Sequence, residues 1–370
     1  MKHLLLSVAI GMGALSGCWA QSFQNKYGMK HPAREFNPKS YVCYQAESPL
    51  MIDGNLNEPS WEKAEWTEYF QDIEGSRKPT PRFKTRAKML WDDKYLYVAA
   101  EMDEPHIWGK LTERDCVIFH DNDFEVFIDP DGDTHGYYEF EMNALNTVWD
   151  LLLVQPYRDQ TQVLDHFNFN GLKTAVNIHG SINNPNDTDK KWTVEMAFPL
   201  DAFEYNSGNK AKAGAQWRIN FSRVEWRTVV KDGKYEKEIN PKTGKSYPED
   251  NWVWSPQGEI AMHMPEMWGF LQFSGKKVGA GTDEYRFNDE ELVKWELRNI
   301  YYAQREYHKK FGKFATKVKD LKKVGLKLEA LKYSPKIYVT PTQYEAIATK
   351  EASKLNWHIN RFGKTWKSKK

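Results

Sequence analysis

Apolar and polar side chains alternate along two neighbouring stretches near the middle of the chain. The first reads FEVFID over residues 124–129, and the second begins at residue 137 and reads YYEFEM. A period of two residues is typical of a β-strand with one buried face. The acidic, glycine-bearing segment between them predicts the turn of a hairpin. Several carboxylates therefore lie on strands rather than only in turns.

Segments of the same kind run from about residue 84 to residue 274, with turn residues between them. KTRAKMLW and KYLYVAAEM flank Asp92 and Asp93 and predict another hairpin. More strand-like segments follow, namely TVWDLLLV, LKTAVNIHG, KWTVEMAFP, QWRINFSRVEW, NWVWSP and WGFLQFS. Many short strands without amphipathic helices between them predict an all-β fold. We expect an antiparallel, jelly-roll-like β-sandwich over residues 46–275.

Helical spacing replaces the alternation after residue 282. Asn288 followed by Glu291 has the form of a capping box. Apolar residues then recur along one broad helical stripe, at Leu292, Trp295, Ile300, Ala303 and Tyr307. Gly312 is expected to end this helix, and Gly325 a second, shorter one. With a closing strand pair in NWHINRFGKTW, residues 283–370 are predicted to form a small α/β appendage.

The N-terminus has the pattern of a signal peptide over residues 1–20. A basic start precedes an apolar run over residues 4–15, which small residues follow. LSGC resembles a bacterial lipobox that would leave a lipidated Cys18, whereas CWAQ allows cleavage before Gln21. Both alternatives predict export, either as a secreted or periplasmic protein or as an outer-membrane lipoprotein. Residues 21–45 are predicted to be an extended leader, and we expect no transmembrane segment.

Composition excludes some functional classes and leaves others open. The formal net charge of +1 gives no reason to expect a nucleic-acid partner. Aromatic residues make up 14% of the 370 residues, which is typical of a strand-rich core and also of exposed platforms that stack on ligand rings. Cys43 and Cys116 allow either a disulfide or two free thiols. No cysteine or histidine spacing indicates a zinc site.

Seven segments occur in the order typical of one known family. They are MIDGNLNEPSWEKA, AKMLWDDKYLYVAAEMDEP, DNDFEVFIDPDGD, YEFEMNALNT, KWTVEMAFPL, WRINFSRVEW and WGFLQFS. In these segments the chain resembles the family 9 carbohydrate-binding modules and their stand-alone bacterial relatives. The resemblance covers residues 47–274 and implies a calcium-associated β-sandwich that binds sugars without cleaving them. It therefore implies a protein that supports carbohydrate catabolism, with an oligosaccharide or polysaccharide as its ligand.

The resemblance also indicates ligand-binding residues. The family holds a terminal sugar between two aromatic rings, and polar side chains contact its hydroxyls. Glu125 matches the family's polar contact, and Met262 occupies the position of the second aromatic ring. The remaining candidates for the ligand site are the rings of Phe119, Trp108 and Trp254 and the polar side chains of Asn143 and Arg223. Trp254 is also compatible with a place in the core.

The acidic residues of the central hairpin have two predicted roles. Asp129, Asp131 and Asp133 have the alternating spacing that suits Ca²⁺, a hard cation that prefers oxygen ligands. The same residues are also typical of an ordinary hairpin turn. We expect Glu125 to face a ligand, and the remaining acids to be divided between a loop metal site and solvated strand positions.

Two other functional classes are weighed against carbohydrate binding. Glu139 and Glu141 share one parity, and a glycoside hydrolase needs two carboxylates placed across the scissile bond. No nucleophile elbow, zinc-ligand histidine pair or phosphate loop is present in the sequence. A haem-binding sandwich is a further alternative, although no haem motif marks the histidines. We therefore expect a non-catalytic binding protein.

Overall fold

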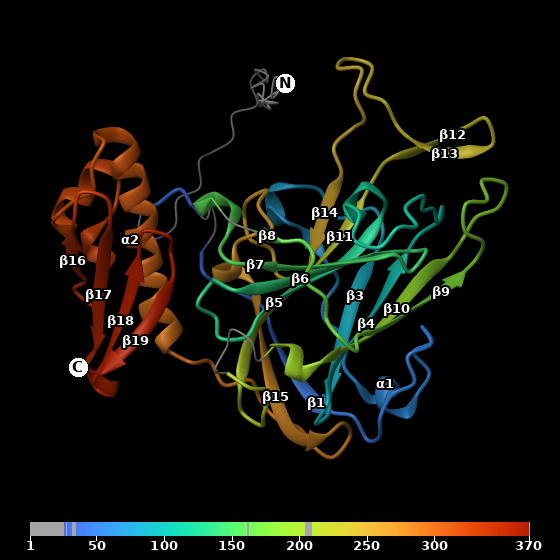
Figure 1. Ribbon diagram of the computed structural model, residues 1–370, viewed down its shortest axis with the longest axis horizontal. Coiled ribbons are helices and arrows are strands. Elements are labelled where there is room, and N and C mark those ends of the chain that lie inside the picture. Colours follow the sequence, from blue (N-terminus) through green and yellow to red (C-terminus); the bar gives the residue numbers. More distant parts are fainter. Residues whose placement is uncertain (1–25, 27, 32–34, 161–162, 204–208, 370) are drawn as a thin grey trace, which may run out of the picture.

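The computed structural model describes residues 26, 28–31, 35–160, 163–203 and 209–369 (Figure 1). The predicted signal peptide and the predicted lipid anchor at Cys18 lie outside the described residues. Among those that are described, no helix is both long and apolar enough to cross a membrane. Cys43 is buried and Cys116 half-buried, and both are free thiols.

One large sheet forms most of the molecule. Its strands are β1 Ser40–Gln45, β2 Gln71–Asp72, β3 Thr85–Trp91, β4 Tyr95–Asp103, β5 Asp123–Asp129, β6 Tyr137–Asn143, β7 Val148–Leu153, β8 Val163–Leu164, β9 Lys173–His179, β10 Lys191–Pro199, β11 Gln216–Glu225, β14 Asp250–Val253 and β15 Gly269–Lys277. Strands β12 Thr228–Lys231 and β13 Lys234–Lys237 form a separate hairpin. The loops carry the short helix α1 Pro59–Lys63 and 3-10 turns at Gly75–Arg77, Ile118–His120, Tyr157–Asp159, Leu200–Phe203 and Pro265–Met267.

This sheet folds over onto itself, which confirms the predicted β-sandwich. Strands β8-β7-β6-β5-β11 form one layer and β3-β4-β10-β9 the other, and β15 and β1 connect the two (Figure 1). The ladders are antiparallel except that β1 runs parallel to both β15 and β3. Strand β1 therefore lies inside the sheet, although it belongs to the stretch predicted to be an extended leader.

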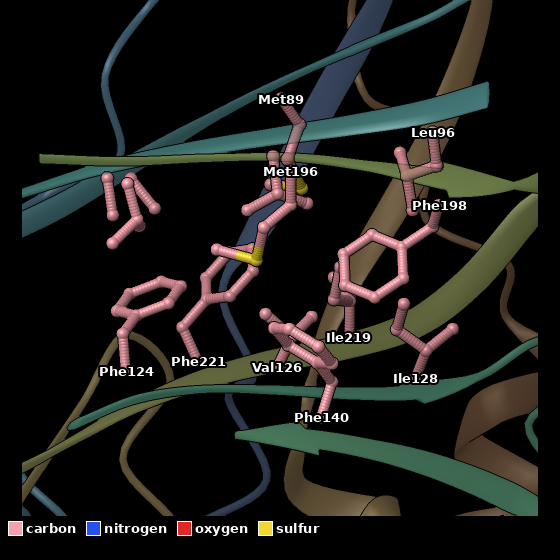
Figure 2. Close-up of a cluster of buried hydrophobic side chains, with 14 of the residues drawn as sticks. Met89, Leu96, Phe124, Val126, Ile128, Phe140, Met196, Phe198, Ile219 and Phe221 are labelled. Carbon is pink, nitrogen blue, oxygen red and sulfur yellow. The ribbon is translucent and has the colours of Figure 1, made fainter. Parts of the chain in front are cut away.

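The main core lies between the two layers and takes every second side chain of the strands. Figure 2 shows Phe124, Val126 and Ile128 of β5 pointing towards Met196 and Phe198 of β10. These side chains are at most 1% exposed. The observed alternation therefore confirms the period of two found in the sequence. It also places the intervening acidic residues of β5 on the opposite face of their layer.

The C-terminal appendage is a helix packed on a small sheet. Helix α2 Glu290–Phe311 ends at Gly312, which has a φ of 68° and so ends the helix in the left-handed conformation. A 3-10 helix, Val318–Val324, follows and ends at Gly325. Further 3-10 turns lie at Leu328–Ala330 and Glu351–Ser353, and the sheet consists of β16 Lys336–Val339, β17 Tyr344–Lys350, β18 Leu355–Asn360 and β19 Thr365–Lys369. These elements have their own hydrophobic core and confirm the predicted α/β appendage.

Polar contacts hold the appendage against the β5–β6 hairpin. Lys294 Nζ donates to the carbonyl of Gly132 at 2.6 Å, and Thr134 Oγ1 donates to the carbonyl of Gly363 at 3.1 Å. Arg218 of β11 forms a buried ion pair with Glu291 of α2 at 2.5 Å. Because breaking a buried pair leaves an unbalanced charge, these contacts fix the position of the appendage on the sandwich.

Candidate functional site

One face of the β5–β6–β11 layer carries four buried carboxyl groups. Asp123 and Glu125 on β5 and Glu139 and Glu141 on β6 point away from the main core, and each is at most 5% exposed. Glu125 lies directly opposite Glu141 in the antiparallel ladder, and Ser222 of β11 lies opposite Glu125 on its other side. We call Asp123, Glu125, Glu139 and Glu141 the acidic face.

The hydrogen bonds of these groups leave several oxygens unpaired. Asp123 Oδ1 accepts a bond from the backbone N–H of Val224 at 3.3 Å, and Glu141 Oε2 accepts one from the N–H of Phe119 at 3.0 Å. Asp123 Oδ2 and Glu139 Oε2 are buried without a hydrogen-bond partner among the described residues. Buried polar atoms are rarely left unpaired, so these oxygens indicate a missing binding partner.

The electrostatics of the acidic face favour its neutralisation. Burial, with a smaller contribution from the charge of Glu249, raises the pKa of Glu125 to about 7. Burial likewise raises the pKa values of Asp123, Glu139 and Glu141 well above the usual range, and the charge of Glu125 adds to each increase. Like charges directly opposite each other destabilise a sheet. The acidic face therefore requires protons or a bound cation.

Three aromatic residues lie next to the acidic face. Trp149 on β7 lies directly opposite Glu141 in the ladder, and its buried Nε1 has no hydrogen-bond partner in the described structure. Phe119 donates its N–H to Glu141, and its carbonyl accepts a bond from Trp226 Nε1 at 2.8 Å. All three rings are half-buried. Lys237 Nζ lies 3.2 Å from the centre of the Trp226 ring, so one face of that ring is covered.

An aromatic cluster and a cavity adjoin the other end of the acidic face. His263 Nδ1 lies 2.8 Å from the Tyr137 hydroxyl, and its Nε2 lies 4.0 Å from Glu139 Oε2. Burial lowers the pKa of His263 to about 3, so this ring is neutral and does not balance the carboxylates. Next to it lies a cavity of about 1000 Å³, lined among others by His263, Met262 and Tyr302. Met262, at the family's second ring position, therefore lies in the cavity wall.

Two polar side chains predicted to contact the ligand, those of Asn143 and Arg223, are hydrogen-bonded within the protein instead. Asn143 donates to the Leu111 carbonyl and to Asp121, and its Oδ1 accepts two backbone N–H groups. Arg223 pairs with Phe124 rather than with Glu125, so it points to the opposite side of the layer. There its guanidinium binds Glu104 and Glu225 at 2.8 and 2.9 Å. The structure thus separates Arg223 from the acidic face.

The two predicted tryptophans are also buried. Trp254 is 1% exposed within the main core and donates Nε1 to Glu68, which leaves no ring face free for a sugar. The core alternative is therefore correct for Trp254. Trp108 is 3% exposed, and its Nε1 has no partner in the described part of the chain. Of the predicted aromatic residues, only Phe119 has a half-buried ring, and its backbone N–H contacts the acidic face at Glu141.

The expected distribution of the acids requires correction. Glu139 and Glu141 are 5% and 2% exposed and are not solvated strand positions. They are buried because Phe119 and His263, which are distant in sequence, cover the face of β6. The sequence analysis also missed Trp149 and Trp226. The hairpin register could have indicated Trp149, since residues 144–147 form a short turn that places Trp149 beside Glu141.

The predicted calcium loop has internal contacts, although burial and the neighbouring carboxylates raise the pKa of Asp129 well above its usual range and that of Asp131 to about 6. Both oxygens of Asp129 accept backbone N–H groups, from Gly132 and Thr134, at 2.9 Å each. Lys364 Nζ lies 3.1 Å from Asp133, and Lys294 binds the carbonyl of Gly132. Ligand atoms of Asp129, Asp131 and Asp133 still lie within 4.8 Å of one another, as one cation would require. Calcium at this loop stays a prediction.

Comparison with known proteins finds a family match over part of the sandwich. The model of the family described as carbohydrate family 9 binding domain-like matches residues 52–228. The matched residues make up slightly less than half of the chain, and in this segment the chain is similar to that family. The segment contains β5, β6, β7 and β11 and therefore the whole acidic face with its three rings. It does not contain β14, β15 or the appendage.

Two curated relatives match part of this chain. It is 28% identical over 158 residues to an exoglucanase, XynX, of Acetivibrio thermocellus, and 27% identical over 158 residues to endo-1,4-beta-xylanase A of Thermoanaerobacterium saccharolyticum. Each match covers 43% of this chain but only 12% and 11% of the respective enzyme. A solved family 9 carbohydrate-binding module from Caldicellulosiruptor kristjanssonii, in complex with cellotriose, aligns with a TM-score of 0.40 at 15% identity over 66% of this chain and 100% of that one.

Proposed function

We propose that the sandwich binds carbohydrate at the acidic face and its aromatic rim, without cleaving it. The observation that carries this proposal is the position of Trp149, a half-buried ring with an unpaired N–H beside Glu141. Trp149 lies within the segment that matches the family 9 model. The names of the two relatives, an exoglucanase and a xylanase, support a β-linked plant polysaccharide as the ligand class.

The chemistry of this surface suits a pyranose ring. An indole face stacks on the apolar C–H face of a sugar, and a carboxylate accepts hydrogen bonds from its hydroxyls. Glu141 lies beside Trp149 on the neighbouring strand and Glu125 lies one strand farther away, so the ring and the carboxylates lie in one row across the layer. The indole N–H of Trp149 adds a donor for a ring or hydroxyl oxygen.

A glycan array on the purified protein, followed by calorimetric titration, tests this proposal. Trp149→Ala should weaken binding of the best glycan about tenfold, because a lost stacking contact of about 1.5 kcal/mol corresponds to that factor. Tyr338→Ala is the matched control, since Tyr338 is 56% exposed on β16 of the appendage. Equal affinities of wild type and Trp149→Ala would refute the aromatic contact.

Glycoside hydrolysis is not favoured by the geometry. The carboxylates of a glycosidase flank the scissile bond about 5–9.5 Å apart. Oxygens of Asp123, Glu125 and Glu141 instead lie within 4.8 Å of one another and are buried. A reducing-sugar assay on xylan and cellulose tests this, and release of product above the level of a boiled control would contradict the binding proposal.

We further propose that the protein is exported and acts in polysaccharide use outside the cytoplasm. The apolar run over residues 4–15 supports export, and the LSGC segment supports lipid attachment at Cys18. Mass measurement of the mature chain from the native host distinguishes the alternatives. A diacylated Cys18 terminus indicates a lipoprotein, a Gln21 terminus a soluble form, and an intact Met1 would refute both.

A further inference from the structure

Asp123, Glu125 and Glu141 form a compact group of carboxylates. A ligand oxygen from each lies within 4.8 Å of the other two, and the three residues are 0%, 5% and 2% exposed. An ion bound at 2.3–2.6 Å from its ligands can bridge oxygens that are up to about 5 Å apart. One Ca²⁺ can therefore contact all three carboxylates.

Positive charge from the protein does not reach this group. In the described part of the chain, Asp123, Glu125 and Glu141 take part in no ion pair with lysine, arginine or histidine. Some other buried acids have such partners, and Glu291, for example, contacts both Arg218 and Lys294. Others, such as Glu195, are held by several N–H donors instead. Three adjacent buried carboxylates with neither a basic partner nor enough donors for all their oxygens are strongly destabilising when charged, so this group calls for a ligand.

Further buried oxygens lie beside the group. The hydroxyl of Ser222 is fully buried opposite Glu125, and hydrogen bonding from this hydroxyl lowers the pKa of Glu125. Glu139 Oε2, two residues along β6 from Glu141, is also buried and is unpaired within the described residues. These atoms are additional oxygen donors of the kind that a hard cation collects.

Two of the three carboxylates are also oriented by backbone donors. A backbone N–H holds one oxygen of Asp123 and one of Glu141, and these bonds fix the direction in which the second oxygen points. Such outer contacts are typical of metal ligands, because they lower the entropy lost when the ion binds. The N–H donors come from Val224 and Phe119, which belong to separate segments of the sandwich.

We propose that Asp123, Glu125 and Glu141 bind one divalent cation of the calcium type, with Ser222 and Glu139 close enough to complete its oxygen shell. This site is distinct from the Asp129–Asp133 loop, whose carboxylates already have backbone and lysine partners. Metal binding here needs no glycan. It can therefore be established or refuted whether or not the proposed carbohydrate contact is correct.

The test uses the whole purified chain stripped of metal with a chelator. Calcium is titrated by calorimetry, and terbium, which replaces calcium at oxygen sites, is titrated by the luminescence that excitation of nearby Trp149 and Trp226 produces. Wild type should bind calcium. Glu125→Gln and Glu141→Gln should each weaken this step at least tenfold, because each removes a charged ligand, and both should abolish the tryptophan-excited terbium signal.

Two further variants separate this site from other acids. Asp131→Asn changes only the loop and should leave the terbium signal intact, and Glu236→Gln on the β13 hairpin should change nothing. Near-UV circular dichroism of each variant confirms that it is folded. A wild type that binds neither ion would overturn the proposal and would mean that the acidic face is protonated. So would calcium binding that Asp131→Asn removes and Glu125→Gln leaves unchanged.

Discussion

Two acidic groups on the same β5–β6 hairpin differ in how their negative charge is balanced. In the loop, Asp129 accepts two backbone N–H groups, and Lys364 of the appendage lies 3.1 Å from Asp133. On the strands, Glu125 and Glu141 face each other without any basic partner in the described structure. Burial raises the pKa of a carboxyl group in both places, that of Asp131 in the loop to about 6 and that of Glu125 on β5 to about 7, but among the described residues only the loop has a lysine partner.

This difference shows which acids remain available to a ligand. The loop carboxylates are satisfied by residues of the same chain, and they serve to attach the appendage to the sandwich. The acidic face keeps unpaired buried oxygens, and within the described residues no lysine or arginine pairs with it. Spacing of acids in a sequence therefore says less about a binding site than the absence of internal counter-charges does.

The largest expected effect comes from removing the positive charge at the loop. Lys294→Met should lower the free energy of unfolding by about 3 kcal/mol, because it leaves Glu291 buried with one partner fewer and leaves the Gly132 carbonyl without its donor. Urea denaturation measures the change. Lys323→Met is the control, since Lys323 is 57% exposed and its pair with Asp320 should contribute little. Equal stabilities of the two variants would contradict the proposed attachment.

Chelation is expected to have the next largest effect and to separate the two acidic groups directly. At free calcium 100 times its dissociation constant, bound calcium stabilises the native state by about 2.7 kcal/mol. Thermal unfolding with and without chelator should therefore show a lower melting temperature in the stripped protein. Glu125→Gln should remove this response, and Asp131→Asn should retain it. The reverse result would assign the ion to the loop.

The sequence predicts the fold well where local patterns decide it. The alternation in FEVFID fixed the two faces of β5, and Gly312 marked the end of α2 because glycine readily adopts the φ of 68° found there. Alternation does not show which of two faces is covered, however. Glu141 is buried by Phe119, which precedes β5. Such tertiary cover could not be deduced from the strand itself.

The candidate site was predictable only in part for a related reason. Glu125 and Phe119 were found from the resemblance of their segments to a family, and both belong to the acidic face or its rim. Arg223 was expected beside Glu125, but the register of β11 places Ser222 there instead. A shift of one residue moves a side chain to the other face of a sheet. The register between two strands that are distant in sequence cannot be predicted from either strand alone.

Glu195, a buried carboxylate outside both acidic groups, shows how far neutral hydrogen-bond donors can stabilise a buried negative charge. Glu195 on β10 accepts Trp61 Nε1 and the N–H groups of Asp53 and Gly54, yet burial raises its pKa to about 7. A raised folded-state pKa gives stability that is present below the unfolded value and lost as pH rises through 7. Nearby Glu58 carries a like charge that adds to the increase.

Glu195→Gln should therefore act in two ways. It should lower stability by about 1–3 kcal/mol, because the amide group leaves the buried N–H of Trp61 without an acceptor. It should also remove a decrease in wild-type stability between pH 5 and pH 8. Urea denaturation of both proteins at the two pH values measures both effects. A stability difference between them that does not change with pH would show that Glu195 does not titrate in this range.

The smallest expected effect concerns Lys364, the appendage residue that pairs with Asp133 of the loop. Lys364 is 47% exposed, and its ion pair with Asp133 should contribute only about 0.2–1 kcal/mol, which salt screens. Lys364→Met should therefore lower stability slightly in low salt and hardly at all in 1 M NaCl. If the loop is nevertheless a calcium site, the loss of a competing cation should increase calcium affinity in this variant, measured by calorimetry on the Glu125→Gln background. Unchanged binding would mean that Lys364 does not compete for the loop, whereas tighter binding would make Lys364 an internal substitute for the ion.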